Sequence, residues 1–140
     1  MTKKISSKVT DSLPSELLFY KAHFNKVLDE KIKLGEELFN RQVHTPEDLK
    51  KNKNDYNTWT NENSEYLKKV FNTEQNEYTR NYDDADAFFF GLNGLRNTPL
   101  DSLKGLKDKI IYKISILKRI RATTDSIKNL LPDTSIRMVI

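Results

Sequence analysis

The sequence predicts an all-α protein, an antiparallel four-helix bundle with a short irregular C-terminal tail. Apolar residues recur at spacings of three and four in successive segments, which is the periodicity of one helix face. Helix breakers are scarce, with four glycines and four prolines in 140 residues. Charged residues make up 31% and hydrophobic residues 36%, a balance that suits long amphipathic helices. Short connections between such helices favour antiparallel neighbours within one domain, residues 1–140.

The first helix is expected to follow a polar, flexible arm, residues 1–11, that has no apolar periodicity. It should begin near Ser12 to Pro14, because serine accepts hydrogen bonds from first-turn N–H groups and proline is tolerated there. It should end near Phe39. Its predicted buried face consists of Leu17, Tyr20, Phe24, Val27, Leu28, Ile32, Leu34 and Leu38.

The second helix has a clear start signal at residues 45–48, where a threonine is followed by a proline and two acids. From there a heptad-like seam alternates spacings of three and four through Leu49, Asn52, Tyr56, Trp59, Asn63, Tyr66 and Val70. Buried asparagines in packed helices usually fix the pairing of the helices. We therefore expect Asn52 or Asn63 to be paired or to lie near a helix end.

The third helix is predicted from about Thr73 to the glycines at 91–94, with an apolar side of Tyr78, Tyr82, Ala85, Phe88 and Phe89. The fourth begins at Thr98-Pro99, which repeats the start signal of the second helix. Its pattern is the longest in the chain, and Pro132 is expected to stop it: Leu103, Leu106, Ile110, Ile114, Leu117, Ile120, Thr124, Ile127 and Leu131. Residues 133–140 then form the tail.

The composition argues against several kinds of chemistry. The absence of cysteine excludes disulfides, thiolate metal sites and cysteine nucleophiles within this sequence. No apolar run approaches the ~20 residues of a membrane span, and the first residues have no apolar signal-peptide core. We therefore expect a cytoplasmic protein that does not enter the membrane.

No catalytic, cofactor-binding or metal-binding residues are predicted. His23 and His44 are the two histidines, and neither has a carboxylate at the spacing that metal-binding bundles use. Asp83, Asp84 and Asp86 lack the alternation, glycine and closing glutamate of a calcium loop, so they are interpreted as a solvated helix face. The expectation is a protein that is not an enzyme.

The charge distribution offers one candidate binding surface. Residues 101–131 contain eight basic residues against three acids, a local charge of +5, while the whole chain carries +4. One interpretation is a solubilising surface partly neutralised by acidic neighbours. The other is a surface that neutralises nucleic-acid phosphates, and its members would be Lys104, Lys107, Lys113, Lys118, Arg119, Arg121 and Lys128.

A second candidate surface is aromatic. Tyr56, Trp59 and Tyr66 recur at helical spacing, which is more typical of a core than of a binding site. If part of this stripe remains exposed, the chain would form a dimer or dock a protein partner through it.

One part of the chain also resembles a known group. Leu34-Gly35-Glu36-Glu37-Leu38, the helix start at Thr45-Pro46, Trp59 and the stretch Glu65 to Phe71 resemble an N-terminal helical region of bacterial predicted nucleotide-binding and TIR-like anti-phage proteins. The resemblance spans residues 30–75 and departs at Asn72, where the usual residue is glycine. In those proteins an effector domain follows, and none is recognised in this sequence. The resemblance implies an accessory or assembly role in bacterial or phage-encoded defence, without catalytic residues.

Two functions are therefore weighed. The first is a non-enzymatic helical interaction or assembly module that binds a protein partner or a second copy of itself. The alternative is a small nucleic-acid-binding protein that uses the basic fourth helix. The salt dependence of binding distinguishes the two functions, because the affinity for nucleic-acid phosphates falls steeply as the salt concentration rises from about 50 to 200 mM.

Overall fold

The computed structural model describes residues 15–84 and 99–129, and this part of the chain is all-α, as the sequence predicts. Three long helices dominate it: α2 (Lys21–Asn40), α3 (Pro46–Val70) and α5 (Pro99–Ala122). A short 3-10 turn, η1 (Thr124–Ser126), follows α5, and residues 77–84 are helical as well. The predicted arm at 1–11, the helix end at 91–94 and the tail at 133–140 lie outside the described residues.

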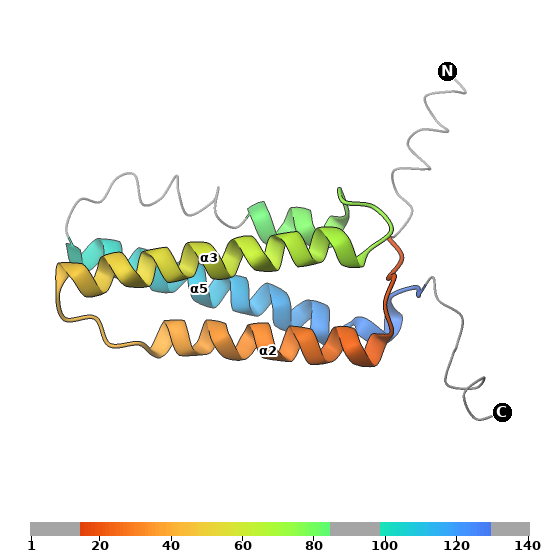
Figure 1. Ribbon diagram of the computed structural model, residues 1–140, viewed down its shortest axis with the longest axis horizontal. Helices are drawn as coiled ribbons and strands as arrows, with labels where there is room; N and C mark the ends of the chain where they lie inside the picture. Colours follow the sequence, from red (N-terminus) through yellow and green to blue (C-terminus); the bar gives the residue numbers. More distant parts are fainter. Residues whose placement is uncertain (1–14, 85–98, 130–140) are drawn as a thin grey trace, which may run out of the picture.

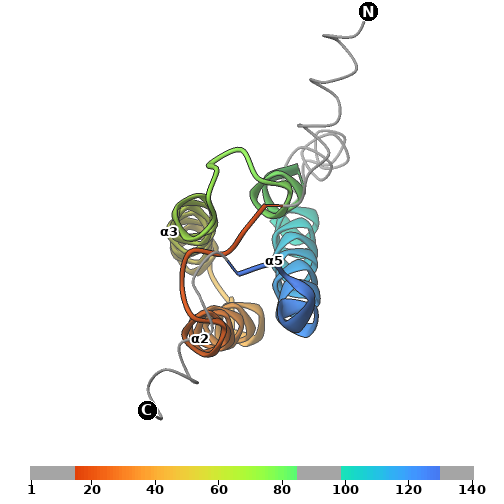
Figure 2. The ribbon, with the colours of Figure 1, turned by 90° about the vertical axis from the view of Figure 1, so that its right-hand side faces the viewer.

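The long helices lie side by side with their axes roughly aligned (Figure 1). A short connection joins α2 to α3, which runs back antiparallel to it, and α5 runs in the same direction as α3 (Figure 1). Viewed end-on, α2, α3, α5 and the segment 77–84 surround a common interior (Figure 2). The complete antiparallel four-helix bundle stays a prediction, because the third predicted helix extends beyond residue 84.

The start of α3 confirms the predicted helix signal. Thr45 Oγ1 accepts a hydrogen bond from the Asp48 N–H at 3.0 Å, and Asp48 Oδ2 accepts one from the Thr45 N–H at 3.2 Å. Together they form a capping box, with proline in the first turn. The acids Glu47 and Asp48 also lie at the positive end of the helix dipole. The local sequence is therefore sufficient to place this helix boundary.

The first predicted helix starts later than expected, and this is a correction. Its first described residues, 15–20, are not helical: Leu17 forms β-bridges, the chain bends at Phe19, and Tyr20 is extended. Helix α2 begins only at Lys21, and its N-cap residue Tyr20 makes no side-chain cap hydrogen bond. We call residues 15–20 the end strap. Its backbone hydrogen bonds to distant segments replace those of a helix: the Leu17 N–H donates to Lys128 O and the Leu18 N–H to Val70 O, both at 2.8 Å.

The end strap closes one end of the molecule (Figure 1). Leu17 forms an isolated β-bridge with Phe71 on one side and another with Asn129 on the other, and its side chain is fully buried. The Asn72 N–H donates to Glu16 O at 2.9 Å, and the Lys21 ammonium donates to Asp125 O at 2.8 Å. The strap therefore ties the start of α2 to the ends of α3 and α5.

The fourth predicted helix ends earlier than expected, which is a second correction. α5 stops at Ala122, before the predicted stop at Pro132. The Thr123 hydroxyl donates to Arg119 O and Ile120 O, and the Thr124 hydroxyl donates to Ile120 O and Arg121 O. Such side-chain bonds to the last carbonyls compete with further helical turns. Thr124 and Ile127 are nevertheless buried, as their place in the predicted stripe requires.

The core lies between α2, α3 and α5, and the contact between α2 and α5 is the most extensive among these elements. The apolar stripe of α2 is buried at Phe24, Leu28, Ile32 and Leu38, whereas Leu34 and Tyr20 are exposed. None of the helices in the described ranges has an apolar stretch that could cross a membrane.

Candidate functional site

The predicted basic surface on α5 is not continuous, because its members face different neighbours. Lys113 is 1% exposed and points into the interior, where its ammonium donates to Thr60 Oγ1 at 2.9 Å. Lys107 is half-buried: its Nζ donates to Phe39 O and lies 5.0 Å from the centre of the Phe39 ring. These two lysines hold α5 against its neighbours and do not line an outer surface.

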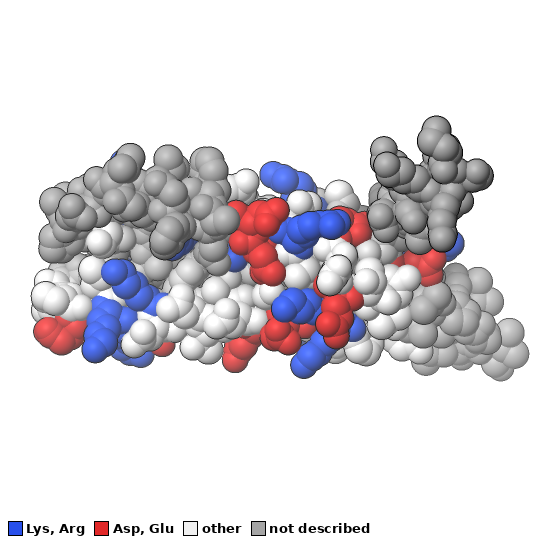
Figure 3. Space-filling model, turned by 90° about the horizontal axis from the view of Figure 1, so that it is seen from above, with Lys and Arg blue, Asp and Glu red and all other residues white. Residues whose placement is uncertain are grey.

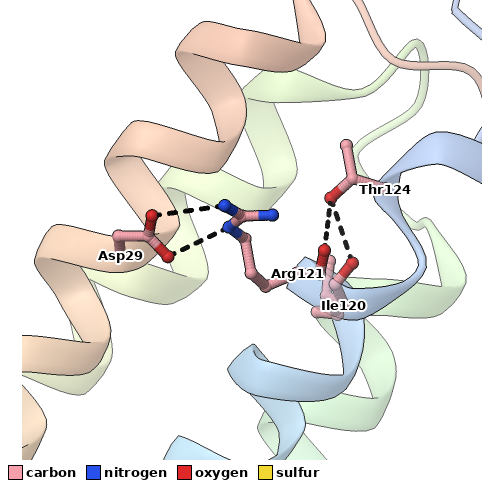
Figure 4. Close-up of polar contacts among 4 residues, drawn as sticks. All are labelled: Asp29, Ile120, Arg121 and Thr124. Atoms are coloured by element: carbon pink, nitrogen blue, oxygen red, sulfur yellow. Dashed lines mark hydrogen bonds and ion pairs between the residues drawn. The ribbon is translucent and has the colours of Figure 1, made fainter.

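Three other basic side chains are paired with acids of α2 and the end strap. Lys118 lies 3.3 Å from Glu36, and Lys128 lies 3.3 Å from Glu16. The Arg121 guanidinium donates two hydrogen bonds to the Asp29 carboxylate, one from Nε at 3.0 Å and one from Nη2 at 3.5 Å (Figure 4). Figure 4 also shows the Thr124 hydroxyl turned back onto the last carbonyls of α5, one turn from this contact. The acids of α2 thus offset part of the positive charge that the sequence places on α5.

Two members of the predicted basic set, Lys104 and Arg119, are exposed on the outside of α5. Ile111 and Tyr112 lie between them along the helix and are 45% and 37% exposed. Seen from above, the surface formed by the described residues has basic and acidic side chains interspersed (Figure 3). On the face shown in Figure 3 the exposed charge is therefore mixed, which gives no single phosphate-binding surface there.

The structure supports the core interpretation of the aromatic stripe, and not the partner-binding one, at two of its three positions. Tyr56 and Trp59 are 3% and 5% exposed, so they belong to the core. The Trp59 indole N–H donates to Lys31 O at 2.9 Å, and the ring lies against α2 at Gly35. Helical spacing places side chains on a common face, but it does not show whether another helix covers that face. Here α2 covers it.

Tyr66 is the half-buried member of that set. Its ring stacks on Phe24 with the ring centres 6.2 Å apart, and the Lys31 ammonium lies 5.1 Å from its centre. Burial raises the pKa of the Tyr66 phenol to about 12 and lowers the pKa of Lys31. Tyr66 therefore stays neutral at physiological pH and stabilises the contact between α2 and α3.

A polar cluster inside the molecule was not predicted as a unit. The Asn63 amide donates to the Tyr82 hydroxyl at 2.7 Å, and the Lys113 ammonium lies 4.0 Å from the centre of the Tyr82 ring. We call Thr60, Asn63, Thr79, Tyr82 and Lys113 the polar seam; all five residues are buried. Asn63 is paired, as predicted. Asn52, the other asparagine of the heptad seam, is fully buried and its side-chain amide has no hydrogen bond.

A pair of exposed aromatic residues was also missed by the sequence reasoning. Phe19 and Tyr20 are 45% and 50% exposed at the end strap, and the Phe19 ring packs edge-to-face against His23. Tyr20 was assigned to a buried helical stripe, which holds only if the helix begins before residue 20. The non-helical backbone of the strap breaks the helical periodicity and turns both rings outward.

The remaining candidate residues form no metal-type cluster within residues 15–84 and 99–129. Asp83 accepts a hydrogen bond from Ser64 at 3.1 Å, Asp84 is exposed, and Asp86 lies outside the described residues. His44 is exposed in the connection between α2 and α3, and its backbone N–H donates to Asp48.

Comparisons of the chain with protein-family models, with curated proteins and with solved structures give no match.

Proposed function

We propose that this chain is a non-enzymatic helical assembly module that associates with a second copy of itself through the aromatic patch Phe19-Tyr20 at its strapped end. The observation that carries the proposal is the exposure of these two adjacent rings, 45% and 50%. Aromatic residues are enriched at protein interfaces, because they bury large areas with few rotatable bonds. The module is a complete antiparallel four-helix bundle in this proposal, and it acts in the cytoplasm.

A second copy is the simplest partner for such a patch. In a two-fold symmetric contact the same surface is used by both chains, so Phe19 and Tyr20 would stack on their counterparts. The end strap supports the patch from beneath, because Leu17 and Leu18 are held by hydrogen bonds to Lys128 and Val70. A patch on a pinned backbone loses little conformational freedom when it binds. The resemblance to anti-phage proteins would place this assembly in a defence system.

Sedimentation equilibrium on the purified chain tests the proposal. We expect a concentration-dependent dimer that is lost in the double variant Phe19→Ser/Tyr20→Ser. The matched control is Leu34→Ser, which removes an equally exposed apolar side chain on the outside of α2. A strict monomer at high micromolar concentration would refute self-association. A dimer that survives the aromatic substitutions would refute the assignment of the surface.

The alternative function is nucleic-acid binding by the outer face of α5. It is favoured by the exposure of Lys104, Lys118 and Arg119 on that helix, with Tyr112 partly exposed among them. It is opposed by the burial of Lys113 and by the pairing of Lys118, Arg121 and Lys128 with acids. Nucleic-acid binding is therefore the second candidate function.

A further inference from the structure

We infer that the helical segment 77–84 is a detachable cover over the members of the polar seam on α3 and α5, Thr60, Asn63 and Lys113, and that it opens as a unit while α2, α3 and α5 remain packed. The inference concerns the internal stability of the chain. It holds whether or not the chain dimerises through Phe19-Tyr20.

The interior is chemically divided. α2 and α5 contribute aliphatic and aromatic side chains to the core, among them Leu28, Ile32, Ile110, Ile114 and Leu117. Segment 77–84 has the sequence EYTRNYDD and contains no aliphatic side chain. Its fully buried residues are Thr79 and Tyr82, and Tyr78 is half-buried. The hydrophobic contribution of segment 77–84 to the core therefore comes from these two tyrosine rings.

Polar contacts add to the two tyrosine rings in the attachment of segment 77–84. The Tyr82 hydroxyl accepts from Asn63, and Asp83 accepts from the Ser64 hydroxyl. Just before the segment, the Asn76 amide donates to Leu67 O at 2.9 Å, and its Oδ1 caps the new helix by accepting from the Thr79 N–H at 2.7 Å.

Glu77 ties the segment to the end strap. Its carboxylate accepts from the Ser15 hydroxyl at 2.7 Å and from the Ser15 N–H at 3.2 Å. Partial burial alone would raise the pKa of Glu77, but these hydrogen bonds outweigh it, and the pKa lies below its usual value. The hydrogen bonds between Glu77 and Ser15 thus hold the beginning of the segment. Next to them, the Tyr78 ring stacks on the Phe71 ring with the ring centres 4.5 Å apart.

Segment 77–84 is held by fewer buried side chains than the core helices, because only Thr79 and Tyr82 of the segment are buried, whereas α2 and α5 each bury a longer apolar stripe. A hydrogen bond contributes little net stability, because water replaces the partner when the contact opens. Burial of an apolar side chain contributes more, because water does not replace that contact. Thr79 Oγ1 and Asn63 Oδ1 are buried without a hydrogen bond, so both gain hydration when the segment leaves. Elements of this kind open locally, below the free energy of global unfolding.

Hydrogen exchange on the unmodified chain is the first test. The Arg80 N–H donates to Asn76 O at 3.1 Å, so helical protection in this segment starts there. We expect the amides of Arg80 to Asp84 to exchange at least about tenfold faster than those of Leu28 and Leu117, with little dependence on low urea concentrations. Equal protection and equal urea dependence in both groups would overturn the inference.

Thiol labelling gives an independent measure, because the chain has no native cysteine to react. Thr79→Cys places a thiol on the buried side of the segment. It replaces a hydroxyl that makes no hydrogen bond, so no hydrogen bond is lost. Val70→Cys is the matched control, since Val70 is fully buried in α3 and is close to cysteine in volume. We expect the thiol at position 79 to react at least about tenfold faster under native conditions. Equal labelling rates after normalisation to global stability would contradict the cover.

A substitution at the seam tests the cause. Tyr82→Phe keeps the ring beside Lys113 but removes the acceptor for Asn63. Loss of about 1 kcal/mol corresponds to roughly fivefold faster exchange, and we expect it in residues 80–84 alone. The control Ile120→Val shortens a core side chain of α5. It should leave unchanged the ratio of the exchange rates between the amides of residues 80–84 and those of Leu28 and Leu117. Uniformly faster exchange in Tyr82→Phe would refute the local opening.

Discussion

Gly35 determines how closely α3 approaches α2. A Cβ atom at this position would lie 2.5 Å from Cζ2 of Trp59 and 2.8 Å from Cγ1 of Ile114. The missing side chain lets the indole reach the α2 backbone, where its N–H donates to Lys31 O. The absence of a side chain at Gly35 thus leaves the space on α2 into which the single tryptophan of the chain packs.

Substitution of this glycine should destabilise the protein although alanine favours helix. Gly35→Ala gains about 1 kcal/mol of helix propensity, but overpacking against Trp59 costs roughly 1–3 kcal/mol. We expect a net loss of stability and a shifted Trp59 emission, measured by urea denaturation followed by fluorescence. The exposed pair Lys33→Gly and Lys33→Ala measures the propensity difference alone in the same helix. A stability gain in Gly35→Ala as large as that difference would contradict the close contact.

Asp55 joins the α2–α3 connection to α3, and its chemistry predicts a pH effect. Arg41 lies 2.5 Å and Lys51 3.0 Å from its Oδ2, and the hydrogen bond from Arg41, followed by that from Lys51, lowers its pKa. The folded state then holds the proton more weakly than the unfolded state. The contribution of Asp55 is therefore complete above its unfolded pKa and is lost as the pH falls through the lowered folded value.

Asp55→Asn should reveal this contribution. The variant should lose about 0.5 kcal/mol at neutral pH, a value typical of exposed ion pairs. The difference from the parent should shrink on acidification and disappear once Asp55 is protonated in both states. Urea denaturation between neutral pH and acid measures it. A difference that stays constant throughout this range would show that the ion pair makes no contribution to stability.

At the scale of elements, helix starts were predictable where the signal is local, and helix ends were not where the cause is distant. Thr45, Pro46 and Asp48 are neighbours in sequence, and they suffice to start α3. The backbone of Leu17 is held by residues near 70 and 128, so no local pattern reports that the end strap is not helical. The early end of α5 depends on hydrogen bonds from the hydroxyls of Thr123 and Thr124. The apolar periodicity continues past these residues and therefore does not indicate the helix end.

Two leucines of the first predicted stripe should therefore behave differently. Leu17 is a fully buried residue of the end strap, whereas Leu34 is 51% exposed on α2. Leu17→Ala should cost about 2–5 kcal/mol through lost burial and a cavity, while Leu34→Ala should change stability by less than about 0.5 kcal/mol. Urea midpoints of the two variants provide the comparison. Similar losses of stability in both variants would instead favour the continuous helix that the periodicity predicts.

At the scale of the whole molecule, charge counting along the sequence overestimated the free basic surface. The basic residues of α5 were counted correctly, but their partners Asp29 and Glu36 belong to α2. Pairing between helices depends on the tertiary arrangement, which the sequence did not specify. In the same way, the aromatic stripe of α3 was recognised, but its covering by α2 was not. The sequence thus predicted the chemical character of each face and not the neighbour that it meets.

Removal of those acids provides a test of nucleic-acid binding. Asp29→Asn/Glu36→Gln should release Arg121 and Lys118 from their ion pairs and raise the affinity for duplex DNA severalfold at about 50 mM salt. Fluorescence anisotropy over about 50–200 mM salt should show a steeper salt dependence than in the parent, by up to two phosphate contacts.

Glu74→Gln/Asp84→Asn is the control for that test, because it removes the same net charge from two exposed positions. Equal effects of the two double variants would indicate nonspecific attraction. Tight binding by the parent that is already strongly salt-dependent would instead favour the alternative function.

The end strap has a consequence for synthesis. Leu17 bridges to Asn129, which lies much later in the sequence, so this contact can form only after residue 129 has left the ribosome. The hairpin of α2 and α3 can associate earlier, since its contacts are closer in sequence. The strap can reach Phe71 and Val70 at that earlier stage, whereas its contacts with Lys128 and Asn129 must wait. A nascent chain that stalls before residue 129 would therefore have a half-closed end, and such incomplete intermediates are the species that chaperones bind.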